Sequence, residues 1–490
     1  MKKVYLVGAG PGDPGLLTLK GREALSIADV VLYDNLANPE LLRFAPPAAE
    51  HIYVGKKKSH HTLTQDEICS LLVEKAREGR CVVRLKGGDP FIFGRGGEEA
   101  EALADAGIPF EVIPGVTTPL GIAAYCGVPL THREHTSAVT FVTGHNVASI
   151  DWDRIGHVET LVLFMGLTHA ADIARELIAK GKDPDTPTMA VRWATRPDQQ
   201  TVVSTLAGIA EAAAHLKPPV TFVIGEVVHL RDKLDWYGKL PLFGQRIVVT
   251  RARDQASEFT AQLRALGADV AEFPVIATVP PADPSAIDGA LARLETYDWL
   301  IFTSVNGVRY FLDRLDASPY DLRGLRARIC AIGPATARAI EALHLKVDIV
   351  PKEYVAESLV EAFAAHDLAG KRILLPRAAV ARDVVPVELG KRGATVDVVE
   401  AYRTVVPPDA AELVAATFAR KPDWITFTSS STVKNFLAIA GPQVLEEVKV
   451  ASIGPVTSDT ARMHGLHVAV EAREHTMDGL LHAIGGSVKG

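Results

Sequence analysis

Residues 83–99, VRLKGGDPFIFGRGGEE, constrain the fold of this chain more than any other segment. An apolar run ends there in Gly87 and Gly88, which allow the backbone to turn sharply and to approach a ligand closely. Asp89 follows at the expected end of a strand, and open α/β sheets bind ligands at the carboxyl ends of their strands. A plain surface turn needs fewer glycines and no flanking phenylalanines. We therefore expect an α/β sheet with a ligand site at this turn.

Short apolar runs alternate with helical patterns through the first half of the chain. We expect strands at 4–10, 30–34 and 81–89, and helices at 16–27 and 64–78, with Thr64 as the N-cap of the second helix. This alternation predicts a mostly parallel sheet. A second block begins near residue 118, and its strand candidates are 139–145, 160–166, 187–193 and 221–228.

Length and composition limit the class of protein. The chain has 490 residues, whereas a single core stops growing near ~250–300 residues, so we expect at least two domains. A net charge of −7 argues against nucleic acid as a partner. The four cysteines form no CxxC pair, which indicates reduced thiols in the cytoplasm and no zinc site. No apolar run approaches the ~20 residues of a membrane span, so no membrane partner is expected.

An internal repeat follows the Pro- and Gly-containing segment 236–246. Three blocks recur in the same order: residues 246–279 align without gaps to 372–405, 298–311 match 423–436, and 331–336 match 452–457. The period is too long for a solenoid. The second half is therefore predicted to contain two related α/β units.

The segment GAGPGDPG, residues 8–15, has the GxGxxG spacing of dinucleotide-binding loops, and Asp34 lies about 20 residues further on. A nicotinamide-dependent oxidoreductase is therefore one candidate. However, pyrophosphate binds through backbone N–H groups at a helix N-terminus, and Pro11 and Pro14 each remove one such donor. Asp13 adds a negative charge where a phosphate would lie. The loop favours a neutral or cationic ligand.

Residues 7–21 and 83–99 together closely resemble the tetrapyrrole methylases, and among them the uroporphyrinogen-III C-methyltransferases, over residues 1–243. The resemblance implies a fold of two subdomains, about 1–117 and 118–243. It implies S-adenosylmethionine as the cofactor, S-adenosylhomocysteine as its product, and no metal. The sulfonium of this cofactor is a cation, which suits the loop. A homodimer formed through this half, and two successive methylations that give precorrin-2, are also implied.

The resemblance assigns roles to individual positions of the first half. Asp34 matches a general base, with a turn cap as the alternative, and Lys56 matches a general acid, although Lys57 or Lys58 could be the relevant amine. The expected cofactor site consists of Pro11, Gly87, Gly88, Asp89, Ile92, Thr117, Thr118, Met165 and Ala194. Thr118 and Ala194 depart from the usual Ala and Gly of the family, and core packing is the alternative for Met165. Arg95, Glu98 and Arg133 match substrate contacts, where guanidinium groups would bind carboxylates.

Residues 243–490 resemble the uroporphyrinogen-III synthases, whose two Rossmann-like domains would here comprise 244–278 with 406–490, and 279–405. The implied reaction is the cyclisation of hydroxymethylbilane with inversion of its last ring. Tyr402 matches a tyrosine thought to help hydroxide leave, and its repeat counterpart is Ile276, so the repeated fold does not require a phenol there. Thr336 and Thr457 match positions near the substrate, with ordinary capping of a helix N-terminus as the alternative.

We therefore expect an α/β protein with an N-terminal two-subdomain tetrapyrrole methylase fold followed by two Rossmann-like α/β domains. The expected activity is that of a bifunctional cytoplasmic enzyme that makes uroporphyrinogen III and methylates it, for a sirohaem or cobalamin pathway. Its expected partners are small-molecule tetrapyrroles. The alternative is a methylase of a later corrin precursor fused to a non-catalytic tetrapyrrole-binding regulatory domain.

Overall fold

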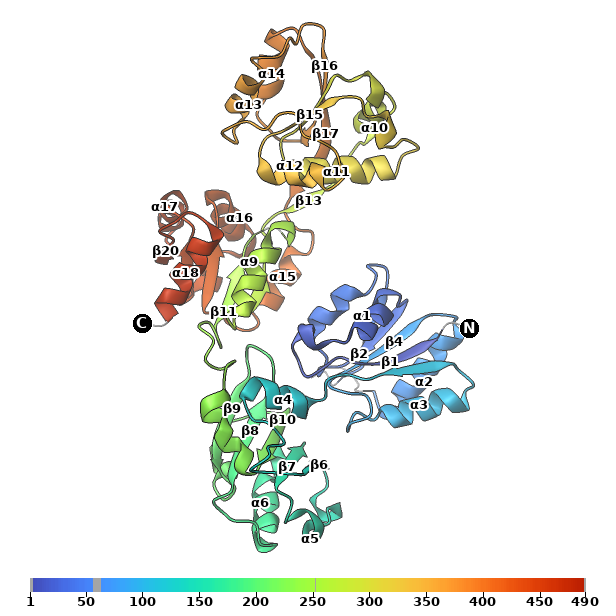
Figure 1. Ribbon diagram of the computed structural model, residues 1–490, viewed down its shortest axis with the longest axis vertical. Helices are drawn as coiled ribbons and strands as arrows, with labels where there is room; N and C mark the ends of the chain where they lie inside the picture. The colour runs from blue at the N-terminus through green and yellow to red at the C-terminus, as the bar shows by residue number, and fades with distance from the viewer. Residues whose placement is uncertain (1–2, 56–62, 252, 489–490) are drawn as a thin grey trace. The chain divides into compact units, whose positions relative to one another are not determined.

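The computed structural model describes residues 3–55, 63–251 and 253–488 (Figure 1). Contacts divide the chain into two compact units. The first comprises Met1–Ile247 with Ala261–Val270 and Ile484–Gly490, and the second comprises Val248–Thr260 and Ala271–Ala483. This division passes through β11 (Arg246–Val249), so the domain boundary at 243–244 stays a prediction. The described strands form four five-stranded sheets.

The first sheet has the strand order β3-β2-β4-β1-β5, and its described pairings are parallel, as predicted. Successive residues of its strands belong to two different core clusters, because both faces of a sheet covered by helices are buried. The strands are β1 (Val4–Gly8), β2 (Val30–Tyr33), β3 (Glu50–Tyr53), β4 (Val82–Lys86) and β5 (Phe110–Ile113); the helices are α1 (Leu19–Ser26), α2 (Gln65–Arg77) and α3 (Gly96–Asp105).

Capping side chains determine where the first helices begin. Thr64 accepts a hydrogen bond from the Glu67 amide and the Glu67 carboxylate accepts one from the Thr64 amide, so the predicted N-cap of α2 is confirmed as a capping box. The helix expected at 16–27 instead begins at Leu19. Thr18 caps it through the Gly21 amide, and Pro14–Leu16 form a separate 3₁₀ turn.

The second sheet is mixed, which departs from the parallel arrangement of the first. Strands β6 and β7 run parallel, whereas β10 runs antiparallel to β7 and β8, and β8 antiparallel to β9. Strand β9 was not predicted from the sequence. The strands are β6 (Val139–Thr143), β7 (Thr160–Phe164), β8 (Pro187–Arg192), β9 (Gln200–Thr205) and β10 (Val220–Ile224); the helices are α4 (Thr118–Cys126), α5 (Trp152–Ile155), α6 (Ala170–Ala179), α7 (Ile209–Ala212) and α8 (Arg231–Leu234).

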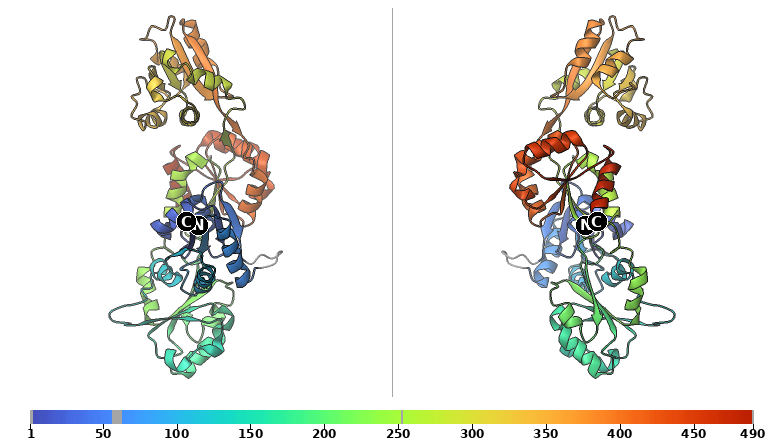
Figure 2. Two further views of the ribbon diagram at one scale, coloured as in Figure 1. Left: turned by 90° about the vertical axis from the view of Figure 1, so that its right-hand side faces the viewer. Right: turned by 90° about the vertical axis from the view of Figure 1, so that its left-hand side faces the viewer.

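The third sheet has the order β12-β11-β18-β19-β20, and helices flank it on both sides (Figure 2). Its further strands are β12 (Asp269–Glu272), β18 (Trp424–Phe427), β19 (Lys449–Ser452) and β20 (Val468–Glu471). Its helices are α9 (Arg253–Ala265), α15 (Ala410–Phe418), α16 (Ser430–Ala440), α17 (Pro455–Met463) and α18 (Met477–Val488).

The fourth sheet has the order β13-β17-β16-β14-β15, with β13 antiparallel to β17 and the other described pairings parallel. The succession β14-α11-β15-α12 recurs as β18-α16-β19-α17, so the predicted internal repeat is confirmed. The strands are β13 (Ala277–Val279), β14 (Trp299–Phe302), β15 (Arg328–Ala331), β16 (Arg372–Ala378) and β17 (Thr395–Val405); the helices are α10 (Ser285–Leu291), α11 (Val305–Asp316), α12 (Pro334–Glu341), α13 (Ala356–Ala362) and α14 (Val384–Lys391).

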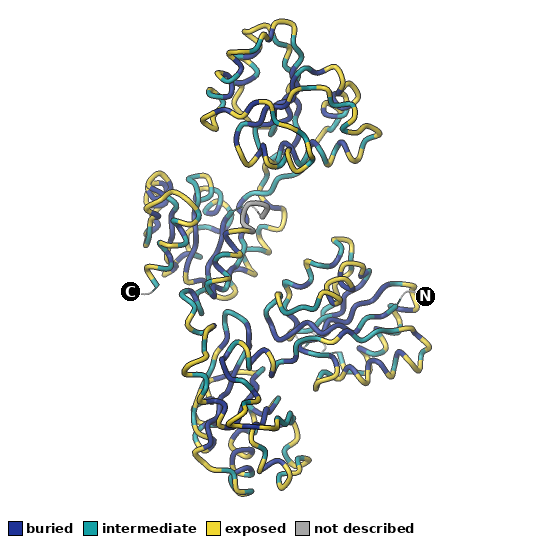
Figure 3. Tube along the Cα trace, viewed as in Figure 1, coloured by how far each residue is buried: buried dark blue, intermediate teal, exposed yellow. Residues whose placement is uncertain are grey.

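Burial follows this arrangement of central strands and outer helices. The strand interiors are buried, whereas the outer faces of the helices are exposed (Figure 3). Among the helices of the described segments, none combines the length and apolar character required to cross a membrane.

Candidate functional site

Two glycine turns meet at the carboxyl ends of β1 and β4. Gly10 and Gly88 form an antiparallel bridge, in which the Gly88 amide donates to the Gly10 carbonyl at 2.8 Å and the Gly10 amide donates to the Gly88 carbonyl at 3.2 Å. Both glycines have φ in the left-handed region, at +77° and +66°. A side chain at Gly115, which follows β5, would overlap the Gly88 carbonyl oxygen. Backbone therefore packs directly on backbone at this edge of the sheet.

The start of α4 lies against the same turn. Asp89 accepts hydrogen bonds from the Phe91 amide at 2.8 Å and from the Gly115 amide at 3.0 Å, so its carboxylate ties the turn to the chain that leads into α4. Thr117 is the N-cap of α4, and a Cβ built on Gly88 would lie 3.6 Å from the Thr118 hydroxyl oxygen. The fold therefore brings together five predicted cofactor residues: Gly87, Gly88, Asp89, Thr117 and Thr118.

The first glycine loop also contacts the end of β8. The Asp13 amide donates to the Thr195 hydroxyl at 2.9 Å, and a Cβ on Gly12 would lie 2.9 Å from the Ala194 carbonyl oxygen. Pro11 is buried, and a Cβ on Gly121 of α4 would lie 2.6 Å from its ring. Pro11 and Ala194, which are distant in the sequence, therefore both lie where the first glycine loop contacts α4 and the segment that follows β8.

Three N–H groups of this loop already have protein partners. The Gly10 amide bonds the Gly88 carbonyl, the Asp13 amide bonds Thr195, and the Gly15 amide bonds the Asp13 carboxylate at 2.7 Å. The second carboxylate oxygen of Asp13 accepts from the Tyr125 hydroxyl at 2.5 Å. A dinucleotide diphosphate would need these donors unpaired, so the dinucleotide interpretation lacks its binding groups here. Backbone carbonyls and apolar side chains suit a sulfonium cofactor instead.

Two apolar side chains of the predicted cofactor site are partly exposed. Ile92 is 37% exposed, and Met165, which follows β7 with φ of +54°, is 51% exposed. Their chain neighbours Phe93 and Phe164 are in edge-to-face contact, with ring centroids 4.9 Å apart. The exposure of Met165 excludes core packing as its role. Both side chains are available to the apolar parts of a ligand.

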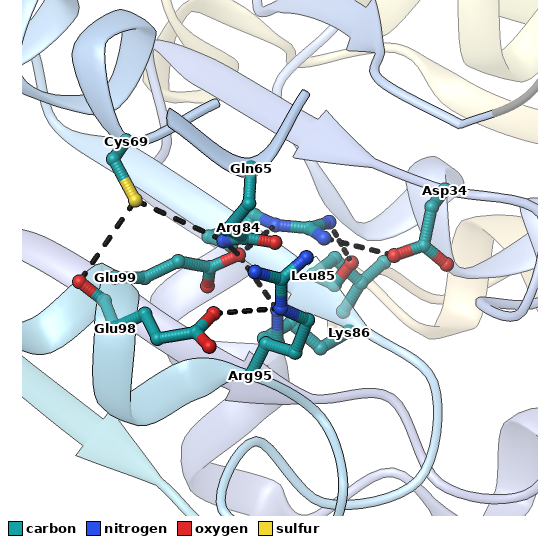
Figure 4. Close-up of polar contacts among 9 residues, drawn as sticks. All are labelled: Asp34, Gln65, Cys69, Arg84, Leu85, Lys86, Arg95, Glu98 and Glu99. Carbon is teal, nitrogen blue, oxygen red and sulfur yellow. Dashed lines mark hydrogen bonds and ion pairs between the residues drawn. The ribbon is translucent and has the colours of Figure 1, made fainter. Parts of the chain in front are cut away.

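Asp34, the predicted base, follows β2 and is held by two contacts. One carboxylate oxygen accepts from the Leu36 amide at 2.9 Å, and the other pairs with the Arg84 guanidinium at 2.9 Å (Figure 4). Asp34 therefore caps the turn with one carboxylate oxygen, while its other oxygen remains paired with Arg84. A Cβ on Gly87 would overlap Leu36, so the turn of Asp34 packs directly on the Gly87 turn.

A buried charge cluster lies behind Asp34, and the sequence analysis did not identify it. Arg84 and Lys86 are 3% and 4% exposed, and both contact the same carboxylate oxygen of the fully buried Glu99, at 3.2 and 2.7 Å (Figure 4). Gln65 donates to that oxygen at 3.2 Å. Burial, and then the neighbouring Arg84 charge, lower the pKa of the Lys86 ammonium. The sequence does carry one sign of this cluster: Arg84 and Lys86 occupy alternate positions of an otherwise apolar strand. Alternate residues of a strand point to the same face of the sheet, so the two charges had to lie together.

The predicted substrate residues of this half are only partly brought together. Arg95 has φ of +59° and immediately precedes α3, and its guanidinium pairs with Glu98 at 2.7 Å. Arg133 is exposed in the turn closed by hydrogen bonds between His132 and Thr136, and the described contacts do not join it to Arg95. The predicted general acid Lys56, with Lys57 and Lys58, lies outside the described residues.

In the second half, Tyr402 of β17 lies against the start of α11. Its hydroxyl is 3.0 Å from the hydroxyl of Ser304, which in turn accepts from the Gly307 amide as the N-cap of α11. The Tyr402 ring stacks on Tyr310, with centroids 5.6 Å apart and an interplanar angle of 14°. Only 8% of Tyr402 is exposed, so the phenol has a defined orientation.

The two predicted threonines occupy equivalent places in the repeat. Thr336 lies in the first turn of α12 and Thr457 in the first turn of α17, and each helix begins with a Gly-Pro pair at its N-terminus, as predicted. They are 4% and 5% exposed. Capping is provided by the preceding glycines without a side-chain hydrogen bond. The substrate roles of both threonines stay predictions.

Comparisons with known proteins agree with both halves of this description. A family model described as "Tetrapyrrole (Corrin/Porphyrin) Methylases" matches residues 3–210, and one described as "Uroporphyrinogen-III synthase HemD" matches residues 257–482. A porphyrin biosynthesis protein of Ruminiclostridium josui is 36% identical over 99% of both chains. A uroporphyrinogen-III C-methyltransferase of Bacillus subtilis is 39% identical over 69% of this chain and 71% of its own length.

Solved structures are similar to each half separately. A uroporphyrin-III C-methyltransferase from Thermus thermophilus, complexed with S-adenosylhomocysteine, is 44% identical and covers 46% of this chain and 99% of its own, with a TM-score of 0.41. A mutant uroporphyrinogen III synthase from the same species is 23% identical and covers 50% of this chain and 99% of its own, with a TM-score of 0.36.

The fold and the two family matches define an α/β enzyme with a tetrapyrrole methylase in its first half and a uroporphyrinogen-III synthase in its second. The chain belongs to the family of porphyrin biosynthesis proteins that join a tetrapyrrole methylase to a uroporphyrinogen-III synthase.

Proposed function

We propose that this chain catalyses two reactions of tetrapyrrole biosynthesis. Its second half cyclises hydroxymethylbilane to uroporphyrinogen III, and its first half methylates that product twice with S-adenosylmethionine to give precorrin-2. The observation that carries the proposal is the presence of both families in one chain, together with a relative that matches 99% of it. We place the domains at 1–243, with subdomains of about 1–117 and 118–243, and at 244–490, where 244–278 joins 406–490 and 279–405 forms the other part.

The cofactor residues of this proposal are the nine named from the sequence, most of which meet at the glycine turns. S-adenosylmethionine supplies an electrophilic methyl group there. The chain contributes the backbone of the two glycine loops and the exposed apolar side chains of Ile92 and Met165. Positioning of the two reactants provides most of the acceleration, because a pyrrole carbon is already nucleophilic.

Asp34 is the proposed base for the proton that the tetrapyrrole loses when its ring carbon is methylated. The carboxylate stands at the end of β2, against the Gly87 turn, and its hydrogen bond from Arg84 orients it. Lys56 is the proposed acid. Arg95, Glu98 and Arg133 are the proposed substrate contacts, suited by charge and exposure to the carboxylates and pyrrole N–H groups of the tetrapyrrole.

Tyr402 is the proposed group that assists the departure of hydroxide from hydroxymethylbilane. Its phenol is buried and hydrogen-bonded to Ser304, an arrangement that can hold a proton donor in one direction. Thr336 and Thr457 are proposed substrate contacts at helix N-termini, where carboxylates are favoured. We further propose a cytoplasmic homodimer formed through the methylase half, whose product serves a sirohaem or cobalamin pathway.

The test is a coupled assay with the purified full chain, hydroxymethylbilane and methyl-labelled S-adenosylmethionine. We expect two labelled methyl groups per tetrapyrrole. Asp34→Ala should abolish label incorporation and leave uroporphyrinogen III formation unchanged, because the base belongs to the first half alone. Loss of both activities in this variant would contradict separate sites, and absence of label with the unaltered chain would contradict the proposed methylase.

A further inference from the structure

Behind the proposed base lies a cluster of charges that the reaction as described does not use. Arg84 and Lys86 alternate along β4 and therefore point to the same face of the first sheet, toward α2 and α3. Glu99, in the first turn of α3, contacts both side chains and is fully buried. Three donors share one carboxylate oxygen of Glu99, whereas its other oxygen, also buried, has no hydrogen-bond partner among the described residues. The cluster therefore retains part of the desolvation cost of a buried charge.

The Arg84 guanidinium is fixed in three directions. Its Nε donates to Glu99 at 3.2 Å, its Nη1 to the Leu85 carbonyl at 3.0 Å, and its Nη2 to Asp34 at 2.9 Å (Figure 4). A planar guanidinium with all its nitrogens engaged has little freedom to rotate. The side chain that reaches Asp34 is therefore anchored on its buried side before it touches the carboxylate.

Asp34 differs from Arg84 in that it reaches the surface. Its side chain is 22% exposed, whereas the Arg84 side chain is 4% exposed and that of Glu99 is fully buried. Other groups affect Asp34 electrostatically: Tyr53 of β3, whose pKa is raised by burial and then by the Asp34 charge, and Lys86 of β4. The hydrogen bond from Arg84 fixes the position of the Asp34 Oδ2 atom, and the Leu36 amide fixes that of Oδ1.

The same turn of α3 connects the base to the proposed substrate contacts. Glu98 is exposed and pairs with Arg95, while its neighbour Glu99 is buried and pairs with Arg84. One helical turn therefore holds a substrate residue on its outer side and the anchor of the base on its inner side.

We propose that Arg84 is the positioning residue for Asp34, with buried Glu99 as its anchor. This inference rests on the proposed function, because it takes Asp34 to be the base of methyl transfer. Arg84 does not touch the substrate; it holds the Asp34 carboxylate at the edge of the site in the orientation that accepts the proton.

The test compares Arg84→Met, Arg84→Lys and the matched control Arg80→Met, all in the full chain. Arg80 precedes the same strand and pairs with Glu50 at the surface, away from Asp34. Single-turnover methyl transfer from labelled S-adenosylmethionine to uroporphyrinogen III is measured in each variant, with S-adenosylhomocysteine affinity and thermal unfolding as measures of folding.

We expect Arg84→Met to lower the single-turnover rate by about 100-fold, the effect of roughly 1 Å of misplacement at a reacting group. Arg84→Lys keeps the charge but cannot reach three acceptors, so its rate should fall about tenfold, less than in Arg84→Met. S-adenosylhomocysteine affinity should stay within about twofold.

A single-turnover rate of Arg84→Met equal to that of Arg80→Met would overturn the inference. If Arg84→Met fails to bind S-adenosylhomocysteine, Arg84→Lys decides: a wild-type rate in that variant overturns the inference, and a lowered rate with intact binding supports it. Retained methyl transfer in Asp34→Ala would instead show that the proposed base is wrong. Activity lost in Asp34→Ala but kept in Arg84→Met would leave the proposed function standing and remove the positioning role alone.

Discussion

Asp34 and Tyr402, the proposed base and the proposed proton donor, each present an oxygen that contacts another side chain. Arg84 fixes the Asp34 carboxylate and Ser304 contacts the Tyr402 hydroxyl, so in both sites the orientation depends on a neighbour from a different element. Neither phenol nor carboxylate is free to sample several directions. Substitutions that keep size but remove the polar atom should therefore affect rate more than stability.

Tyr402→Phe should lower the rate of uroporphyrinogen III formation by about 100-fold, at the lower end of what a positioned proton donor contributes. The measurement is the yield of the III isomer from hydroxymethylbilane against the spontaneous I isomer. Tyr320→Phe is the matched control, because Tyr320 is 44% exposed and outside the proposed site. Equal rates in the two variants would contradict the role of the phenol.

The residues recoverable from the sequence are those that carry a recognisable motif. Asp34, Arg95 and the glycine turns could be named because they recur at fixed places in characteristic strings. Arg84 and Glu99 could not, because a charge in an apolar strand gains its meaning only from the helix that packs over it. The contact between Tyr402 and Ser304 joins residues 98 positions apart, which local patterns do not encode.

At the scale of elements, the carboxyl ends of β1, β4 and β5 form one backbone surface. A methyl group on Gly115 would overlap the Gly88 carbonyl and lie 2.7 Å from the Gly8 Cα, so the three segments could not keep their spacing. The amide of Gly115 would also shift away from Asp89. These turns form most of the proposed cofactor surface.

Gly115→Ala should therefore weaken S-adenosylhomocysteine binding at least tenfold, about 1.4 kcal/mol, and lower methyl transfer accordingly. Titration calorimetry of the full chain provides the measurement. Gly289→Ala is the control, since a Cβ there meets nothing within 4 Å in α10. Unchanged affinity in Gly115→Ala would show that the glycine turns do not form the cofactor surface.

Elements with strong local signals were predicted, and those set by tertiary pairing were not. Thr64 and Glu67 define the start of α2 by themselves, and the Gly-Pro pairs define α12 and α17. Strand β9 is half exposed and weakly patterned, so its antiparallel pairing with β8 determines it. The mixed second sheet likewise follows from pairings that alternation of strands and helices does not specify.

At the scale of the whole molecule, the two halves would catalyse consecutive reactions. Uroporphyrinogen III, the product proposed for residues 244–490, is the substrate proposed for residues 1–243. A fusion raises the local concentration of such an intermediate without requiring a channel. Each half has its own sheets and core clusters, so the two activities should be separable by point substitutions.

The most direct test is titration of the intact chain with S-adenosylhomocysteine and, separately, with NAD. The predicted cofactor residues that meet at the glycine turns predict saturable binding of the demethylated cofactor. The engaged N–H groups of the first loop predict no heat from the dinucleotide. Binding of NAD, or a folded chain that binds neither molecule, would contradict the account of the first half.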